Sequence, residues 1–288
     1  MRTDGRRTRR QPHAPAVPGA GLLPVLLGGM LLGVAASGCG LVEDLGLQRN
    51  PNPTNLFDVF TRPSPGQAAR WAVDPFNADH RFRGTSLLAS APFAGDEVYL
   101  AMFEANSADP DPAVRAAAVR GLAHHGDPSH VPLIVDRLSD EDTLVRLAAA
   151  RALQRIHNPE AVPALLRRLD EQAEPEHAVR AACAHALGQY PQRRVLDSLA
   201  GALRDRSLSV NVNAREALVI LTGRDDLSVD PEPWFRFVST AEAPFEQQSR
   251  YRYPVFQRDR RLVEFVPLYP AMQFEPSAEP IGLPRVER

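Results

Sequence analysis

Apolar residues recur at helical spacing through the middle of the chain. In the segment 145–153, "VRLAAARAL", Val145, Ala149, Ala152 and Leu153 fall on one face of a helix. Three further segments align with it without gaps, "VRAAAVRGL" at 114–122, "VRAACAHAL" at 179–187 and "VNVNAREAL" at 210–218. The leading valines are 31, 34 and 31 residues apart. The pattern therefore predicts four copies of one amphipathic helix.

A second helix is predicted in each repeating unit, after a short break such as "GDPSH" or "HNPEA". The segments "VPLIVDRL" at 131–138, "VPALLRRL" at 162–169 and "LDSLAGAL" at 196–203 align, and proline is tolerated in the first helical turn. The predicted N-caps of the first helices stand three residues before each leading valine, at Asp111, Asp142, Glu176 and Ser207. A fainter copy, "HRFRGTSLL", occupies 80–88. One such pair cannot bury its apolar face alone, so the pairs are expected to stack.

The repeated motif D-x-x-V-R-x-x-A-x-x-A-L resembles that of HEAT-repeat proteins, in the short bacterial form named after phycobilisome lyases. The resemblance implies an all-α, right-handed α-solenoid of four to five helix pairs, whose second helices line the concave side. Degenerate capping helices are expected over 63–108, and repeats with a C-terminal cap over 109–239. Trp234 and Phe237 are expected to cover the open end of the core.

The amino terminus has the three parts of an export signal: a basic start, an apolar stretch at about 20–36, and small residues. The following "AASGC" resembles the lipobox of bacterial lipoproteins, which implies a signal peptide over 1–38 and acylation of Cys39. An uncleaved anchor helix with an incidental cysteine is the alternative. Residues 39–62 are predicted to be a flexible tether. The soluble part would then face the periplasm or the exterior of the bacterial cell envelope, held to a membrane by lipid.

The charge of the predicted mature chain argues against nucleic-acid binding. From Cys39 onward it has 28 Arg and 34 acidic residues, a formal net charge of −6, and no Lys. With two cysteines, Cys39 and Cys183, no disulfide framework is expected. Cys183 occupies a small-residue position of the repeat and is interpreted as a buried filler.

Two groups of recurring polar residues are interpreted as structural. Arg115, Arg146 and Arg180 share one repeat position and are predicted to pair with the cap carboxylates of neighbouring units, as an architectural ladder. Four histidines lie near two successive turns: His124, His125, His130 and His157. Stacking of the repeats could bring His125 and His157 together, so a metal or pH-responsive site is an alternative interpretation. No cysteine or carboxylate recurs with ligand spacing, so no metal or other cofactor is predicted.

The second helices carry the predicted partner-binding surface, on positions that point away from their apolar stripes. These positions are Asp136, Arg137, Arg167, Arg168, Asp197 and Ser198. An ordinary solvated helix face is the alternative. The proline-rich tail, 240–288, is predicted to be partly extended or disordered: its short apolar pieces either pack on the solenoid or bind a partner, and a flexible arm is the alternative.

No phosphate loop, carboxylate pair or Ser/His/Asp arrangement is visible, so neither enzymatic activity nor a small-molecule substrate is expected. The leading hypothesis is a membrane-anchored, non-catalytic scaffold that binds an unidentified protein. The family resemblance suggests a bilin-lyase-like enzyme or a chaperone for a chromoprotein as an alternative, and a purely structural envelope linker is another.

Overall fold

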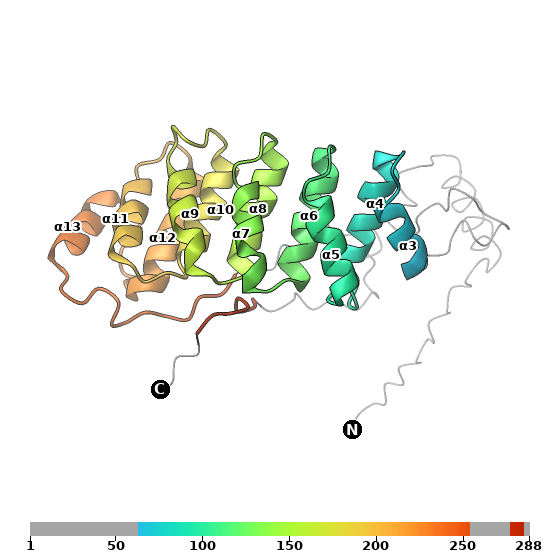
Figure 1. Ribbon diagram of the computed structural model, residues 1–288. Helices are drawn as coiled ribbons and strands as arrows, with labels where there is room; N and C mark the ends of the chain where they lie inside the picture. The colour runs from blue at the N-terminus through green and yellow to red at the C-terminus, as the bar shows by residue number, and fades with distance from the viewer. Residues whose placement is uncertain (1–62, 254–276, 285–288) are drawn as a thin grey trace, which may run out of the picture. The chain divides into compact units, whose positions relative to one another are not determined.

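The computed structural model describes residues 63–253 and 277–284. These residues form eleven α-helices, and short 3-10 turns at Pro128–His130 and Pro159–Ala161 lead into α7 and α9 (Figure 1). The helices are α3 (Pro65–Ala72), α4 (Ala78–Ala89), α5 (Glu97–Asn106), α6 (Pro112–His125), α7 (Val131–Arg137), α8 (Thr143–Arg155), α9 (Val162–Leu169), α10 (His177–Leu187), α11 (Arg193–Ala202), α12 (Leu208–Thr222) and α13 (Pro231–Thr240).

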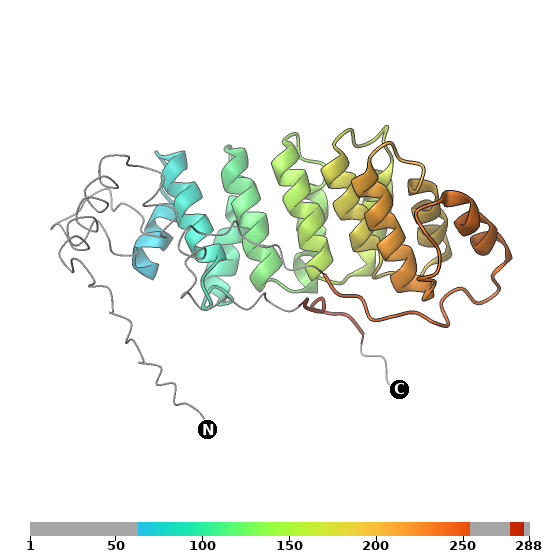
Figure 2. The ribbon, with the colours of Figure 1, turned by 180° about the vertical axis from the view of Figure 1, so that it is seen from behind.

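The helices stack pairwise in two layers, which confirms the predicted all-α, HEAT-type arrangement. The first helices α4, α6, α8, α10 and α12 each pack against the next, and they face the viewer in Figure 2. The second helices α5, α7, α9, α11 and α13 form the layer in front in Figure 1. Each of α5, α7, α9 and α11 packs against the first helix of the following pair. The described residues thus contain five pairs, with α3 added at the amino-terminal end against α4.

Side-chain caps start three of the first helices where the sequence predicts. Asp111 accepts hydrogen bonds from the backbone N–H groups of Ala113 and Val114, and Asp142 and Glu176 cap α8 and α10 in the same way. Ser207 stands at the N-cap position of α12 as predicted, but its side chain makes no capping hydrogen bond. Its Oγ lies 2.9 Å from the hydroxyl of Ser209 instead.

Small residues allow the first helices to approach closely. Ala118, Ala149 and Cys183 occupy the same repeat position and are fully buried, and burial raises the pKa of the Cys183 thiol. At the other end of the core, the buried Trp234 donates from Nε1 to the carbonyl of Ser228 at 2.8 Å and meets Phe237 edge-on. The interpretation of Cys183 as filler and of Trp234 as the closing residue is confirmed.

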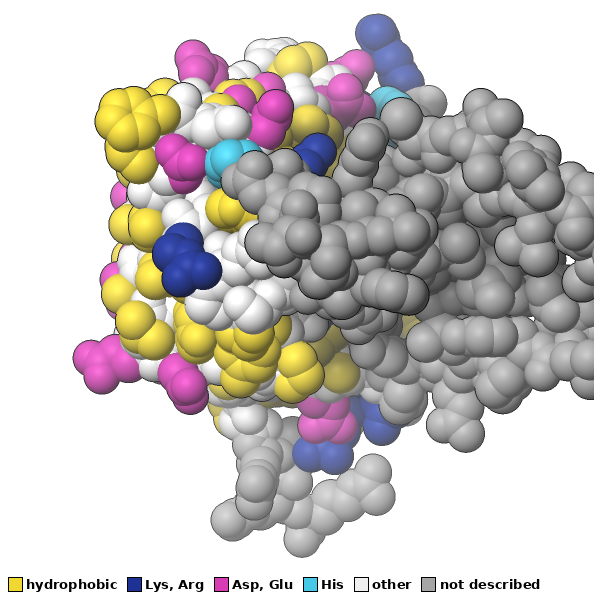
Figure 3. All heavy atoms as spheres, turned by 90° about the vertical axis from the view of Figure 1, so that its right-hand side faces the viewer, with side chains coloured by type: hydrophobic (Ala, Val, Ile, Leu, Met, Phe, Trp, Pro, Cys, Tyr) yellow, Lys and Arg dark blue, Asp and Glu magenta, His cyan; other side chains and the backbone are white. Residues whose placement is uncertain are grey.

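Apolar side chains remain exposed at the amino-terminal end of the stack. Phe76 is 96% exposed, and Val73 and Val98 are more than half exposed. Figure 3 looks at this end, where hydrophobic side chains stand beside acidic ones. This end thus differs from the carboxyl-terminal end, where an aromatic residue is buried.

Two short extended segments of the tail pack along the carboxyl ends of the first helices. We call these segments, 249–253 and 277–284, the strap. Tyr251 is buried, and the backbone of Ile281 bridges Arg155 and His157 just after α8. For these residues the structure shows packing on the solenoid, one of the two alternatives that the sequence left open.

Several sequence predictions fall outside the described residues. They are the signal peptide over 1–38, the lipidation of Cys39, the tether over 39–62 and the part of the tail between 253 and 277. Within residues 63–253 and 277–284, no helix is both long and apolar enough to cross a membrane.

Candidate functional site

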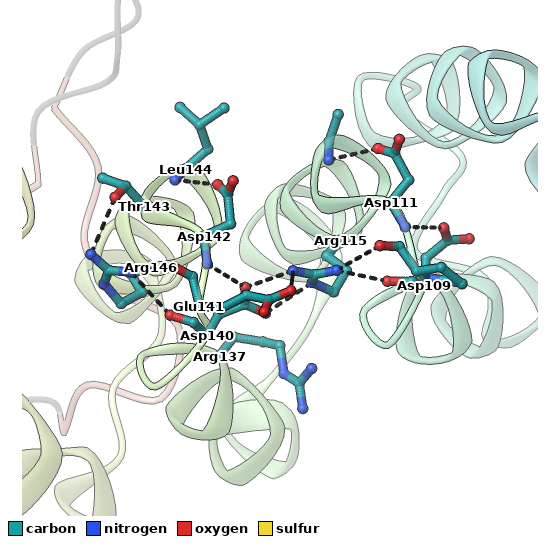
Figure 4. Close-up of polar contacts among 12 residues, drawn as sticks. Asp109, Asp111, Arg115, Arg137, Asp140, Glu141, Asp142, Thr143, Leu144 and Arg146 are labelled. Carbon is teal, nitrogen blue, oxygen red and sulfur yellow. Dashed lines mark hydrogen bonds and ion pairs between the residues drawn. The ribbon is translucent and has the colours of Figure 1, made fainter.

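A ladder of arginines links each repeat to the next, and Figure 4 shows the rung formed by Arg115 and Asp140. Arg115 donates from Nε and Nη2 to the two carboxylate oxygens of Asp140 at 2.9 and 2.8 Å. Its Nη1 donates to the carbonyls of Asp109 and Pro110, both at 3.0 Å, in the loop before its own helix. One guanidinium therefore ties the loop before α6 to the loop before α8.

The same geometry recurs in three other units. Arg81 pairs with Asp109, Arg146 with Glu174, and Arg180 with Asp205, each through two nitrogens and two oxygens. Such bidentate pairs are strong and fix the orientation of both partners. In the last unit, Asn211 takes the arginine position. It donates to the carbonyls of Leu203 and Asp205 in the loop before its own helix.

Three of the four ladder carboxylates favour the ionised state. Burial raises the pKa of Asp109, Asp140 and Asp205, but bonds from arginine and from the backbone outweigh it, so the pKa of each lies below its usual value. The hydrogen bonds to these carboxylates raise the pKa of Arg81, Arg115 and Arg180 in turn.

The ladder confirms the predicted pairing between neighbouring units but corrects its partners. The arginines pair with carboxylates that stand two residues before the caps, and not with the caps Asp111, Asp142 and Glu176, whose oxygens are used on helix N–H groups. An acidic residue two positions before each cap recurs in all four units, as D-x-D, D-x-D, E-x-E and D-x-S. That signal was available in the sequence and was missed.

The predicted partner-binding residues divide into two groups. Asp136, Arg167 and Asp197 are exposed on α7, α9 and α11. Ser198 is half-buried, and its hydroxyl donates to the carbonyl of Arg194 at 2.8 Å. The structure thus presents three of the six side chains directly to solvent.

Arg137 and Arg168 have structural contacts in place of free guanidinium groups. Arg137 donates from Nη1 to the carbonyl of Ser107 in the preceding loop at 3.2 Å. Arg168 donates to the carbonyl of Ala173 at 2.8 Å and lies 3.7 Å from the buried carboxylate of Glu174. Both side chains are half-buried, so they support the loops around the ladder.

An open groove of about 450 Å³ lies between α9 and α11. Leu166, Leu169 and Ala202 contribute apolar surface, and a Cβ added at Gly201 would meet no atom within 4 Å. Asp170 and Glu171 line the groove just after α9, and Ser198 of α11 lines its opposite side. The second-helix layer therefore offers a concave, partly apolar surface with acidic groups beside it.

The histidines do not converge. His125 lies 3.1 Å from the carbonyl of Ala89 and stacks on Phe103, whereas His157 stacks on Tyr190 with ring centroids 4.8 Å apart. Among residues 63–253 and 277–284, no three His, Cys, Asp or Glu side chains are placed to hold a metal ion.

One family profile and two solved structures are similar to this chain. The profile for HEAT repeats matches residues 101–176. YibA of Escherichia coli has a solved structure that is 19% identical and has a TM-score of 0.47. It aligns over 72% of this chain and 77% of its own. The complex of CpcE and CpcF of phycocyanin lyase from Nostoc is 16% identical with a TM-score of 0.38, over 67% and 98% of the two chains.

No match is found among curated protein sequences. The matched segment begins in α5 and ends at the cap of α10, so it contains two complete rungs of the ladder, Arg115–Asp140 and Arg146–Glu174. The helix pairs, the ladder and the matched segment together show HEAT repeats in an all-α, solenoid-like arrangement within the described part of the chain.

Proposed function

We propose that this chain is a lipid-anchored, non-catalytic scaffold in the bacterial cell envelope, and that it binds a protein partner on its second-helix layer. The observation that carries the proposal is the groove between α9 and α11, the helices that also carry the exposed charges of Arg167 and Asp197. Shape and charge of this kind suit a protein surface. The export signal and the lipobox-like "AASGC" support the anchor.

The use of the reactive side chains supports a non-catalytic role. Four arginines are bonded in the ladder, and the one cysteine in the described residues is buried with a raised pKa. A buried thiol of raised pKa is a poor nucleophile. Visible absorbance from a bilin bound to the purified protein would instead favour the lyase-like alternative.

Site-specific photocrosslinking tests the binding surface. A crosslinking amino acid is placed at Arg167 or at Asp197 on the second-helix layer, and at the exposed Glu216 of α12 on the first-helix layer as a control. We expect the same partner to crosslink from 167 and 197, and not from 216. With the crosslinker at 197, Arg167→Glu should weaken the crosslink. Equal crosslinking from 216 would refute this surface.

Mass spectrometry of the mature amino terminus tests the anchor separately. We expect an acylated Cys39 as the first residue, because two or more acyl chains give stable membrane attachment. A chain that retains Met1 would refute the anchor and leave the binding surface untouched.

A further inference from the structure

The strap buries one site on the outer face of the first helices. Arg120 of α6, Arg151 of α8, His185 of α10 and Glu216 of α12 occupy the same repeat position. The other three side chains are exposed, whereas His185 is only 5% exposed. His185 is therefore buried because the strap crosses α10, and not because of its place in the repeat.

The position one helical turn further on behaves in the same way. His124 of α6 is exposed and Arg155 of α8 is half-buried, but Gln189, just after α10, is 2% exposed. At both positions the α10 side is therefore buried where the strap crosses it.

Tyr251 fills this site. Its side chain is 2% exposed, and its hydroxyl lies 2.8 Å from Nδ1 of His185, with the two rings edge to face. The simplest arrangement has the hydroxyl donating to an unprotonated Nδ1, so it requires a neutral imidazole.

The rest of the strap is held by a few separate contacts. The backbone N–H of Ser249 donates to Ile220, that of Tyr253 to Ala278, and that of Ile281 to Arg155, at 2.8, 3.1 and 2.8 Å. Arg250 pairs with Glu279, which joins the two segments of the strap. Elements with so few buried contacts open before the core does.

We propose that the strap is an acid-released cover, which closes over α10 while His185 is neutral and detaches when His185 takes up a proton. Protonation would bury a cation against an uncharged phenol, and no carboxylate pairs with His185 among the described residues. Detachment returns the imidazole to water, at a position that is exposed in the neighbouring repeats.

The titration supports the direction of this response. Burial lowers the pKa of His185 to about 4, and an exposed imidazole titrates near 6.5. His185 has the lower pKa in the closed state. The contribution of its neutral form to the stability of the closed state is therefore complete above pH 6.5 and is lost as the pH falls toward 4. For these two values, opening becomes about 30-fold more favourable between pH 7.5 and pH 5.0.

Neighbouring charges do not change this direction, because burial is the one cause of the shift at His185. The titratable groups on the elements around it are Arg151 and Arg155 on α8, Tyr190 after α10, Glu216 on α12, and Arg250, Tyr251, Arg252, Tyr253 and Glu279 on the strap. His157, whose backbone N–H donates to Ile281, also has a pKa lowered by burial.

Hydrogen exchange on the full-length chain, read by mass spectrometry, tests the proposal. Exchange of peptides covering 245–253 and 277–284 is measured at pH 7.5 and 5.0 and corrected for the intrinsic rate at each pH. We expect protection of these peptides to fall about 30-fold at pH 5.0, while a peptide from α6 keeps its protection. Unchanged protection of the strap would overturn the proposal.

Two variants and a control separate the role of His185 from a general effect of acid. His185→Gln keeps an acceptor for Tyr251 without a proton to gain, so most of the pH response should disappear. His177→Gln, at an exposed histidine on the same helix, should leave it unchanged. An equal fall in wild type and His185→Gln would overturn the proposal. Tyr251→Phe keeps His185 titratable, so it should lower protection at both pH values and retain the fall.

Discussion

The ladder arginines show how one side chain holds two repeats together. All five N–H donors of Arg146 have acceptors: two oxygens of Glu174, the carbonyls of Asp140 and Glu141, and the hydroxyl of Thr143. Glu174 itself is fully buried. The buried guanidinium of Arg146 therefore has all its hydrogen bonds satisfied. Removing it would leave the Glu174 carboxylate without its main partner in a medium of low dielectric constant.

Arg146→Ala should therefore destabilise the protein by about 3–5 kcal/mol, because the Glu174 carboxylate loses its bidentate partner inside the protein. Urea unfolding followed by circular dichroism measures this change. Arg206→Ala is the matched control: Arg206 is 89% exposed and 3.9 Å from Glu171, and little change is expected.

The double change Arg146→Met with Glu174→Met distinguishes loss of the pair from loss of shape. Since the buried charge is then removed with its partner, much of the lost stability should return. If the double variant were as unstable as Arg146→Ala, the unpaired carboxylate would not be the cause.

At the scale of elements, close helix contacts depend on single small residues. Gly84 of α4 lies against α3, and a Cβ built there would be 2.3 Å from the backbone nitrogen of Ala72 and 2.4 Å from the carbonyl oxygen of Ala68. Both are backbone atoms, which cannot rotate away. The α3–α4 contact therefore requires glycine at this position.

Gly84→Ala should displace α3 and cost about 1–3 kcal/mol, and hydrogen exchange of residues 65–72 should increase. Gly201→Ala in α11 is the matched control, because both glycines are helical and both variants gain about 1 kcal/mol of helix propensity. At Gly201 the new methyl group meets open space, so that variant should be neutral or slightly more stable. Equal effects of the two changes would contradict a packing role for Gly84.

Periodicity predicted the repeated elements well and the contacts between them less well. The apolar pattern located α6 to α12, because each copy repeats the same spacing. The ladder carboxylates were harder to identify, since their separation from the arginine alternates between 28 and 25 residues as loop lengths change. Helix α3 has no repeated counterpart in the sequence. The repeat pattern therefore identified Gly84 as a small residue but could not predict that it packs against α3.

At the scale of the whole described stack, long-range contacts are the least predictable. Tyr251 and His185 are 66 residues apart, and nothing in either local sequence points to the other. Repeats contact mainly their neighbours, so a solenoid is stabilised one interface at a time. The strap is different, because Ser249, Tyr251 and Ile281 bond to α12, α10 and α8 in turn, so it spans three successive repeats.

This distribution of titratable groups predicts two separate losses of stability in acid. The pKa of His185 is lowered to about 4 by burial, so the unfolded chain binds its proton first, and stability falls between pH 6.5 and 4 by up to about 3 kcal/mol. The ladder carboxylates of Asp109, Asp140 and Asp205 have lowered pKa values in the folded state, so their contribution to stability is full above pH 3.8 and is lost as the pH falls below it.

Urea unfolding at pH 7.5, 4.5 and 3.0 separates the two losses, provided that wild type and His185→Gln are compared. The wild type should lose stability from pH 7.5 to 4.5, and His185→Gln should lose less, because its side chain has no proton to gain. The remaining loss comes from His124 and His157, whose pKa values burial also lowers. Both should fall steeply from pH 4.5 to 3.0, since both retain Asp109, Asp140 and Asp205. A wild type equally stable at pH 7.5 and 4.5 would show that the burial of His185 costs nothing on protonation, and the strap would then have another means of attachment.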